Sequence, residues 1–245
     1  MQEQAGLLGE RLGCSGLAVA TLEGEPGLRA ALHLATGRRA LVLPILMADG
    51  WTFRERLPVD LAKALQDGGP DEIAVCAPIG LARELAPMIA ARATREAERR
   101  GWSASQCTLL LVAHGTKRDG NSYRATERHA KAIRDTAVFA AVKTGYLEQE
   151  PGAADVIARL SGPLIVIGMF AAPGVHATTD MEELLAGHGS QAAYLGPVSD
   201  DPALTDLLVR QTARAGAMVA VADSTQDELA LRLRHSCAAS ASEDS

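Results

Sequence analysis

The chain has 245 residues, of which 47% are hydrophobic and 22% charged, so it can build an ordinary globular core. Its net charge of −6 argues against a dedicated nucleic-acid binder, and an aromatic content of 3% argues against a binding site built on stacked rings. No apolar run reaches 18 residues, the first thirteen residues lack the pattern of a signal peptide, and the four cysteines are scattered, which together predict a cytoplasmic protein with reduced thiols and no membrane partner.

Short apolar runs alternate with helical patterns from the beginning of the chain. The predicted strands lie in the runs 16–22, 40–47, 73–78, 108–114, 138–147, 164–170, 192–196 and 217–222. Amphipathic patterns at 81–101 and 122–136 predict helices between them, and the polar stretch 101–106 is the best candidate for a linker. Continuous apolar strands that alternate with helices indicate an α/β fold, in which helices cover both faces of a parallel sheet.

Parts of the chain repeat each other at an offset of 119 to 125 residues. Leu22–Gly27 (LEGEPG) matches Leu147–Gly152 (LEQEPG), and two further matches follow in the same order. We therefore predict two similar lobes, each a parallel sheet flanked by helices, with the active site in the cleft between them. Residues 1–101 would form a degenerate lobe and residues 102–215 the lobe that carries the active site.

Residues 216–245 contain one more predicted strand, 217–222, and a small, polar tail that we expect to be disordered. The segment 219–225 resembles 110–116 in its pattern of apolar and polar residues. Our hypothesis is that strand 217–222 returns to complete the first lobe, as in a circularly permuted repeat.

Three polar residues of the second lobe each follow a predicted strand. His114 follows the run 108–113, Glu148 follows the run 138–147, and His176 follows the run 164–170 after a short loop. Ligands of parallel sheets bind beyond the carboxyl ends of the strands. Two imidazoles and a carboxylate suit a divalent ion such as Co²⁺, Fe²⁺, Ni²⁺ or Zn²⁺, and they also suit proton removal, because imidazole titrates near pH ~6.5.

These motifs also carry a family resemblance. The strand that ends in Ala113-His114-Gly115-Thr116, the segment Leu147–Pro151, and Gly168-Met169-Phe170 followed by His176 and Asp180 resemble the class II chelatases of the sirohydrochlorin (CbiX) type. The resemblance implies an enzyme, a sirohydrochlorin cobaltochelatase or ferrochelatase, of cobalamin or sirohaem biosynthesis. Its metal substrate would be Co²⁺, or else Fe²⁺ or Ni²⁺, inserted into sirohydrochlorin or a related tetrapyrrole, and no nucleotide would be needed.

The resemblance also implies roles for individual residues. His114 and His176 would hold the metal or accept the pyrrole protons, with Glu148 as a further ligand or a proton relay. The first lobe keeps Glu23 at the position of Glu148 but has Thr52 at that of His176, so the chemistry is assigned to the second lobe alone. For Asp180 the plainer interpretation is that its carboxylate stabilises the first turn of a helix.

A tetrapyrrole of this type is rich in carboxylates, so local basic groups must bind it. The candidates are Lys117, Arg118, Lys143, Arg54 and Arg56.

Three other classes of protein are alternatives to the chelatase: a carrier, an α/β hydrolase and an NTPase. A metal or tetrapyrrole carrier that has kept the fold needs no catalysis, although it would not need all of His114, Glu148 and His176. An α/β hydrolase is disfavoured because no GxSxG motif is present, and the absence of a P-loop argues against an NTPase. The sequence leaves open whether the protein is a monomer or a homodimer.

Overall fold

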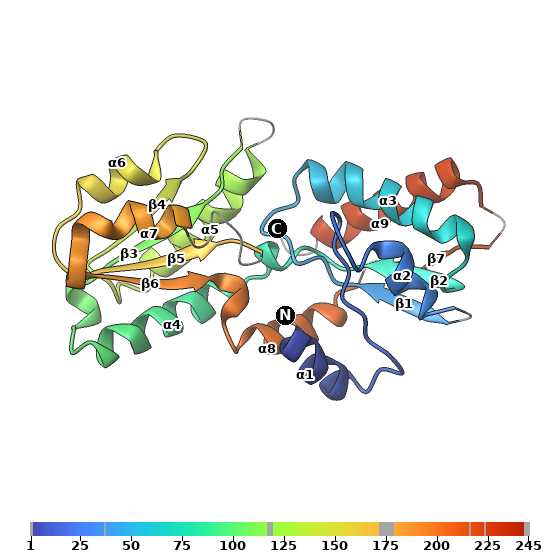
Figure 1. Cartoon of the computed structure of the whole chain (residues 1–245), viewed down its shortest axis with the longest axis horizontal. Helices are drawn as coiled ribbons and strands as arrows, with labels where there is room; N and C mark the ends of the chain where they lie inside the picture. Colours follow the sequence, from blue (N-terminus) through green and yellow to red (C-terminus); the bar gives the residue numbers. More distant parts are fainter. Residues whose placement is uncertain are drawn as a thin grey trace. The chain divides into compact units, whose positions relative to one another are not determined.

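The computed structural model describes residues 2–36, 38–116, 120–171, 179–215, 217–222 and 224–242 (Figure 1). Its internal contacts divide the chain into two compact units. Unit 1 combines Met1–Ala82 with Thr205–Ser245, and unit 2 is Arg83–Leu204. The division falls after residues 82 and 204, whereas the repeat predicts that the lobes end at 101 and 215.

Unit 2 contains a parallel sheet of four strands in the order β4-β3-β5-β6. The strands are β3 (Thr108–Ala113), β4 (Ala141–Tyr146), β5 (Leu164–Met169) and β6 (Ala192–Pro197). Ala113 pairs with both Tyr146 and Met169, so the carboxyl ends of the three strands β3, β4 and β5 are level. The predicted α/β fold with a parallel sheet is confirmed in this unit.

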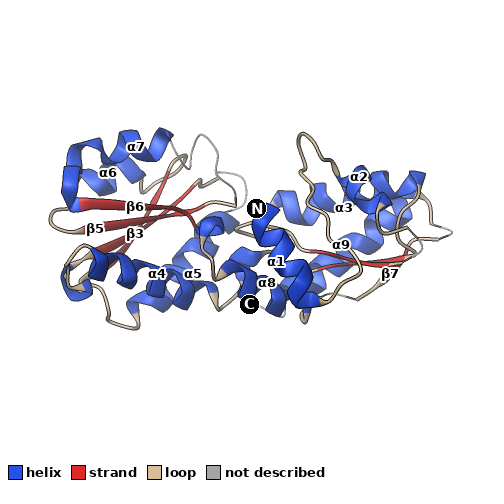
Figure 2. Cartoon of the chain, turned by 60° about the horizontal axis from the view of Figure 1, so that its bottom comes forward, coloured by secondary structure: helices blue, strands red, loops and turns tan. Residues whose placement is uncertain are grey.

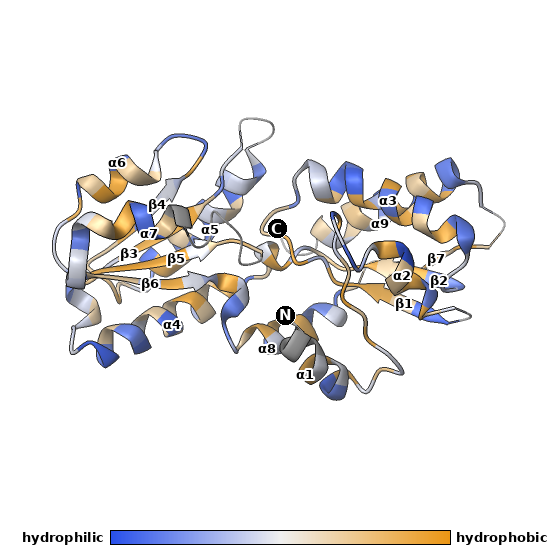
Figure 3. Ribbon diagram, viewed as in Figure 1, coloured by the Kyte–Doolittle hydropathy of each residue, from blue (hydrophilic) through white to orange (hydrophobic). Residues whose placement is uncertain are grey.

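Helices cover both faces of this sheet. In Figure 2, α6 and α7 lie above the strands and α4 and α5 lie below them. Their bounds are α4 (Leu85–Arg99), α5 (Asn121–Arg134), α6 (Ala153–Ala158) and α7 (Thr179–Leu185). Burial on both faces explains why β3 and β5 are apolar along nearly their whole length, as Figure 3 shows. Within the described ranges, no helix combines the length and the apolarity needed to cross a membrane.

One carboxylate on α4 is strongly perturbed. Glu96 accepts hydrogen bonds from Arg99 (2.7 Å) and from Arg100 (2.6 Å), which are one turn further along the helix. These bonds, Arg99 first, lower the pKa of Glu96 to about 2, against a smaller opposing effect of burial. Glu96 therefore stays charged down to low pH in the folded chain.

Unit 1 has a mixed sheet of three strands in the order β1-β2-β7, rather than the predicted parallel sheet. The strands are β1 (Arg39–Val42), β2 (Glu72–Val75) and β7 (Val219–Ala220). β1 and β2 are parallel, whereas β7 pairs antiparallel with β2. β1 matches β5 in the repeat, and β5 pairs in parallel with β3. In a permuted copy, the strand equivalent to β3 would therefore lie beside β1 and parallel to it. The structure thus gives the segment 217–222 a different neighbour and a different direction from those that our hypothesis predicts.

Among the residues that the structure describes, unit 1 holds the α-helices α1 (Gln2–Leu12), α2 (Leu28–His33), α3 (Leu57–Ala64), α8 (Leu204–Thr212) and α9 (Gln226–Ser242). α9 packs against α3 and β2 and buries Leu229, Leu233, Cys237 and Ala241, which lie four residues apart on one face. The expected disordered tail is therefore helical as far as Ser242, because its small side chains fit against the core. Burial raises the pKa of the Cys237 thiol to about 12.

The repeated LExEPG segment folds in the same way in both units. In unit 1 the Thr21 N–H donates to the Pro26 carbonyl (2.9 Å), and the Glu25 carboxylate accepts from the Gly27 N–H (3.2 Å). Unit 2 has the same two contacts 125 residues later. The Tyr146 N–H donates to the Pro151 carbonyl and the Gly152 N–H donates to the Glu150 carboxylate, both over 3.0 Å. In unit 1, however, the predicted strand 16–22 is reduced to a single bridge between Thr21 and Gly27.

Candidate functional site

His114 and Glu148 meet at the carboxyl edge of the unit 2 sheet. His114 follows β3 directly, and Glu148 is the second residue after β4. Their backbones continue the pairing of the two strands, because the Glu148 N–H donates to the His114 carbonyl over 2.9 Å. The sheet itself therefore places the two side chains together.

The side chains of this pair approach each other without joining. His114 Nδ1 lies 3.6 Å from Glu148 Oε2, which is longer than a hydrogen bond. The His114 side chain is 46% exposed and that of Glu148 is 60% exposed, so an ion or a macrocycle can reach both. The pair can offer one nitrogen and one oxygen donor to a cation, or accept and pass on protons.

Gln149 holds the turn that follows His114. Its side-chain oxygen accepts a hydrogen bond from the Thr116 N–H (2.9 Å), which ties the His-Gly-Thr turn to the segment of Glu148. Gly115 lies between, with φ +79°, and a Cβ at this position would come within 2.7 Å of Gln149 Cγ. Gly115 is thus required both by its backbone angle and by the packing of Gln149.

A surface hollow of about 490 Å³ opens beside this turn. It is lined by Thr116, Gly120, Tyr123, Arg124 and Gln149. Thr116 and Gln149 belong to the motifs quoted from the sequence but had no role assigned, and Gly120, Tyr123 and Arg124 were not predicted as site residues. One signal was available for Gln149, since it interrupts the repeated LExEPG motif at the position where the first copy has Gly24.

Three of the predicted site residues, His176, Lys117 and Arg118, lie outside the described residues. Among the residues that the structure describes, no group of three or more His, Cys, Asp or Glu side chains is close enough to hold a metal ion. The candidate site is therefore built here on the pair His114 and Glu148.

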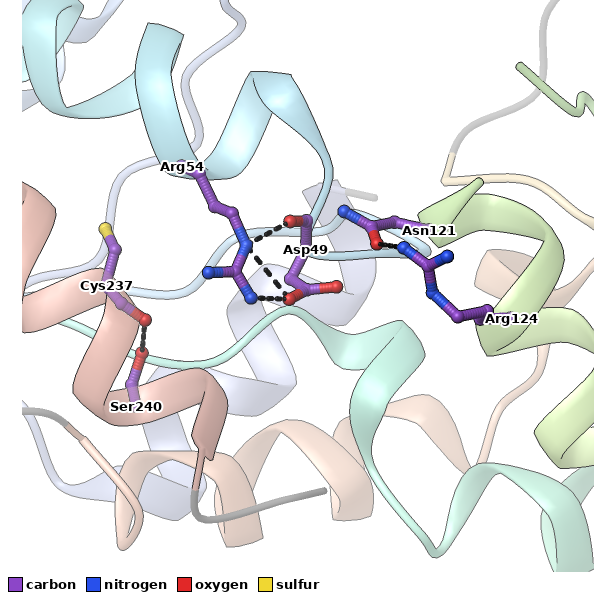
Figure 4. Close-up of polar contacts among 6 residues, drawn as sticks. All are labelled: Asp49, Arg54, Asn121, Arg124, Cys237 and Ser240. Atoms are coloured by element: carbon purple, nitrogen blue, oxygen red, sulfur yellow. Dashed lines mark hydrogen bonds and ion pairs between the residues drawn. The ribbon is translucent and has the colours of Figure 1, made fainter. Parts of the chain in front are cut away.

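The other predicted substrate-binding residues are Lys143 in unit 2 and Arg54 and Arg56 in unit 1. Lys143 is exposed in the middle of β4, opposite Leu110 of β3, about five residues or ~16 Å along the strand from Glu148. Arg54 and Arg56 belong to unit 1 and already contact carboxylates. Arg54 pairs with Asp49 (Figure 4), while Arg56 pairs with Glu23 (2.7 Å) and Asp60 (3.2 Å).

The pairing of Arg56 with Glu23 distinguishes the two copies of the repeat. Glu23 stands at the position of Glu148, so in unit 1 an arginine of the same unit neutralises the equivalent carboxylate. In unit 2, Glu148 instead faces the imidazole of His114. The two copies of the repeat thus differ in the group that faces this carboxylate.

Comparisons with known proteins point in one direction. The family model CbiX matches residues 1–96 and 108–215. A relative from Halobacterium salinarum, a probable sirohydrochlorin cobaltochelatase, is 25% identical over 231 residues, which cover 80% of this chain and 78% of the relative.

Solved structures share the fold. CbiX, the terminal enzyme for biosynthesis of siroheme in denitrifying bacteria, superposes with a TM-score of 0.74 at 28% identity, over 86% of this chain and 88% of its own. SirB from Bacillus subtilis with Fe³⁺ superposes with a TM-score of 0.67 at 16% identity, over 87% and 88% of the two chains, and this likeness concerns the fold alone.

Proposed function

Because the chain belongs to the CbiX family, we propose that it inserts a divalent metal ion into sirohydrochlorin or a related tetrapyrrole, as a step of cobalamin or sirohaem biosynthesis. We propose Co²⁺ as the favoured substrate and Fe²⁺ as the next. The relative from H. salinarum and the siroheme enzyme support the class of reaction.

The observation that carries this proposal is the spacing of His114 and Glu148. Nitrogen and oxygen ligands bind ions of this class at about 2.0–2.2 Å, so two ligands of a tetrahedral ion are about 3.3–3.6 Å apart. The 3.6 Å between His114 Nδ1 and Glu148 Oε2 matches that separation. A pair that is exposed on the surface also holds an ion weakly enough to release it to a macrocycle.

Metal insertion exchanges one divalent ion for two pyrrole protons. We propose that the metal passes from His114 to the macrocycle, and that the neutral imidazole then accepts a proton from the pyrrole nitrogen that binds the metal. Glu148 passes protons on to water through its exposed carboxylate. His176 is proposed as the second imidazole, and Lys117 and Arg118 as groups that bind substrate carboxylates.

The donor set favours cobalt over iron. Imidazole and carboxylate ligands bind the divalent ions of the first transition row in an order that rises from Fe²⁺ to Co²⁺. Nickel binds more tightly still, so its supply in the cell would decide whether it competes.

The test is anaerobic incubation with sirohydrochlorin and Co²⁺, followed by absorbance. The wild type should metallate the macrocycle faster than buffer alone. His114→Ala and His176→Ala should lose most of this acceleration, about 100-fold or more if each acts in proton transfer. His188→Ala is the matched control, because His188 is a half-buried histidine of the same unit whose Nε2 lies 3.4 Å from the Leu160 carbonyl oxygen.

Two outcomes would contradict the proposal. A wild type that is no faster than buffer, although it binds Co²⁺ or the macrocycle, would indicate a carrier. If His114→Ala and His188→Ala both keep full activity, the His114–Glu148 pair is not the active site.

A further inference from the structure

We propose that the hollow lined by Thr116, Gly120, Tyr123, Arg124 and Gln149 binds a carboxylate arm of the macrocycle, with Arg124 as its cation and Tyr123 as its wall. The inference rests on the proposed function and assigns a substrate subsite to it. Arg124 and Tyr123 would then act in substrate binding rather than in metal binding.

The hollow adjoins the candidate metal site through the chain itself. Thr116 is two residues beyond His114, and Gln149 is the residue after Glu148. The hydrogen bond from the Thr116 N–H to the Gln149 side chain (2.9 Å) fixes this part of the lining. A flat ring whose nitrogens face His114 and Glu148 has its acidic arms at its rim, and two lining residues of the hollow, Thr116 and Gln149, adjoin that pair along the chain.

Arg124 supplies the charge of the hollow. Of the five described lining residues, it alone carries a formal charge. Its guanidinium has five N–H donors in a planar fork that matches a carboxylate, and Asn121 accepts from one of its nitrogens (Figure 4). The side chain folds back over Gly120, where a Cβ would lie 3.3 Å from Arg124 Nη1. This conformation keeps the guanidinium beside the hollow.

Tyr123 supplies a fixed apolar wall. Its ring packs at 5.3 Å against that of Tyr146, which is 1% exposed at the end of β4. Tyr123 itself is 38% exposed, so part of it is anchored to the core and part faces solvent. An aromatic ring held in this way can pack against the rim of a macrocycle at little cost in conformational entropy.

The test measures binding of metal-free sirohydrochlorin by absorbance under anaerobic conditions, in parallel with binding of Co²⁺ alone. Arg124→Gln should weaken macrocycle binding about 3- to 10-fold and leave Co²⁺ binding unchanged, because it removes a charged hydrogen bond at an exposed site. High salt should shrink the difference. Tyr123→Phe should bind like the wild type, and Tyr123→Ala should bind more weakly.

The matched control is Lys131→Gln, which removes one positive charge from the same helix about two turns away. Lys131 is exposed, and its ammonium group pairs with Asp135 (2.7 Å). Thermal unfolding of each variant checks that it folds. If Arg124→Gln binds the macrocycle as well as Lys131→Gln does, or if it weakens Co²⁺ binding equally, the hollow is not the subsite.

The two proposals fail separately. A wild type that binds the macrocycle through Arg124 without metallating it would refute the proposed insertion and keep the subsite. A wild type that metallates the macrocycle with no effect of Arg124→Gln on its affinity would refute the subsite alone.

Discussion

Replacing Gly115 by alanine should destabilise unit 2 more than the backbone angle alone explains. A non-glycine residue with positive φ costs about 1–2 kcal/mol, partly offset by about 0.4–1 kcal/mol from a less flexible unfolded chain. At Gly115 the new Cβ would also meet Gln149 Cγ at 2.7 Å, so Gln149 must move and its bond to Thr116 is lost. That loss adds about 0.5–1.5 kcal/mol.

The matched control is Gly101→Ala. Gly101 has φ +71°, and a Cβ there would have nothing within 4 Å. We therefore expect Gly115→Ala to lower the free energy of unfolding by about 1 kcal/mol more than Gly101→Ala does, as measured by urea denaturation. In a Gln149→Ala background, where the clash and the bond to Thr116 are both absent already, Gly115→Ala should cost no more than Gly101→Ala does.

Activity gives a second measure of the same contact. Because Gly115 follows His114, displacement of the turn should also slow metal insertion in Gly115→Ala, whereas Gly101→Ala should keep its rate. Equal stabilities and equal rates of the two variants would refute the idea that Gln149 holds this turn.

Three further predictions concern the stability of the chain. Leu233→Ala in α9 should lower the free energy of unfolding by about 2–5 kcal/mol, because Leu233 is fully buried. Leu231→Ala on the same helix should lower it little, because Leu231 is 52% exposed. Equal losses of the two variants in urea denaturation would contradict the packing of α9. Folding lowers the pKa of Glu96, so its charge stabilises the fold above about pH 4.5. This contribution is about 1–2 kcal/mol once screening at the exposed Arg99 is allowed for, and it should fade as the pH falls towards 2. The gap in melting temperature between the wild type and Glu96→Gln should therefore narrow with acid, and a constant gap would count against it. In the native protein a thiol reagent should modify Cys14 quickly and the three buried cysteines only after unfolding; fast reaction of all four would show that their burial is transient.

The sheet of unit 2 was predictable because its strands are buried on both faces. The sequences of such strands are continuous apolar runs, and the bounds of β3 and β5 agree with the predicted runs to within one residue. The meeting of His114 and Glu148 followed from the same pattern, since residues that come directly after neighbouring parallel strands share one edge.

Other features depended on neighbours that the pattern cannot reveal. The run 16–22 has the apolar character of a strand, yet it makes only one bridge, because strand formation requires a partner backbone as well as propensity. The direction of β7 and its place beside β2 are likewise properties of the assembled core. Tyr123 and Arg124 were missed because they lie in the first turn of a helix, away from any strand end, and only the folded chain brings them beside Gln149.

Unit 1 is built from the two ends of the chain, and this affects the order in which the two units can fold during synthesis. Residues 1–82 leave the ribosome first, but their core includes Leu229 and Leu233, which are made about 147 residues later. At 5–20 residues per second, this interval lasts about 7–30 s. The whole of unit 2 emerges within it, so the unit with the candidate site can fold while the earlier segment still waits for α9. Nascent chains should therefore expose the apolar face of α3 to chaperones until α9 has been translated.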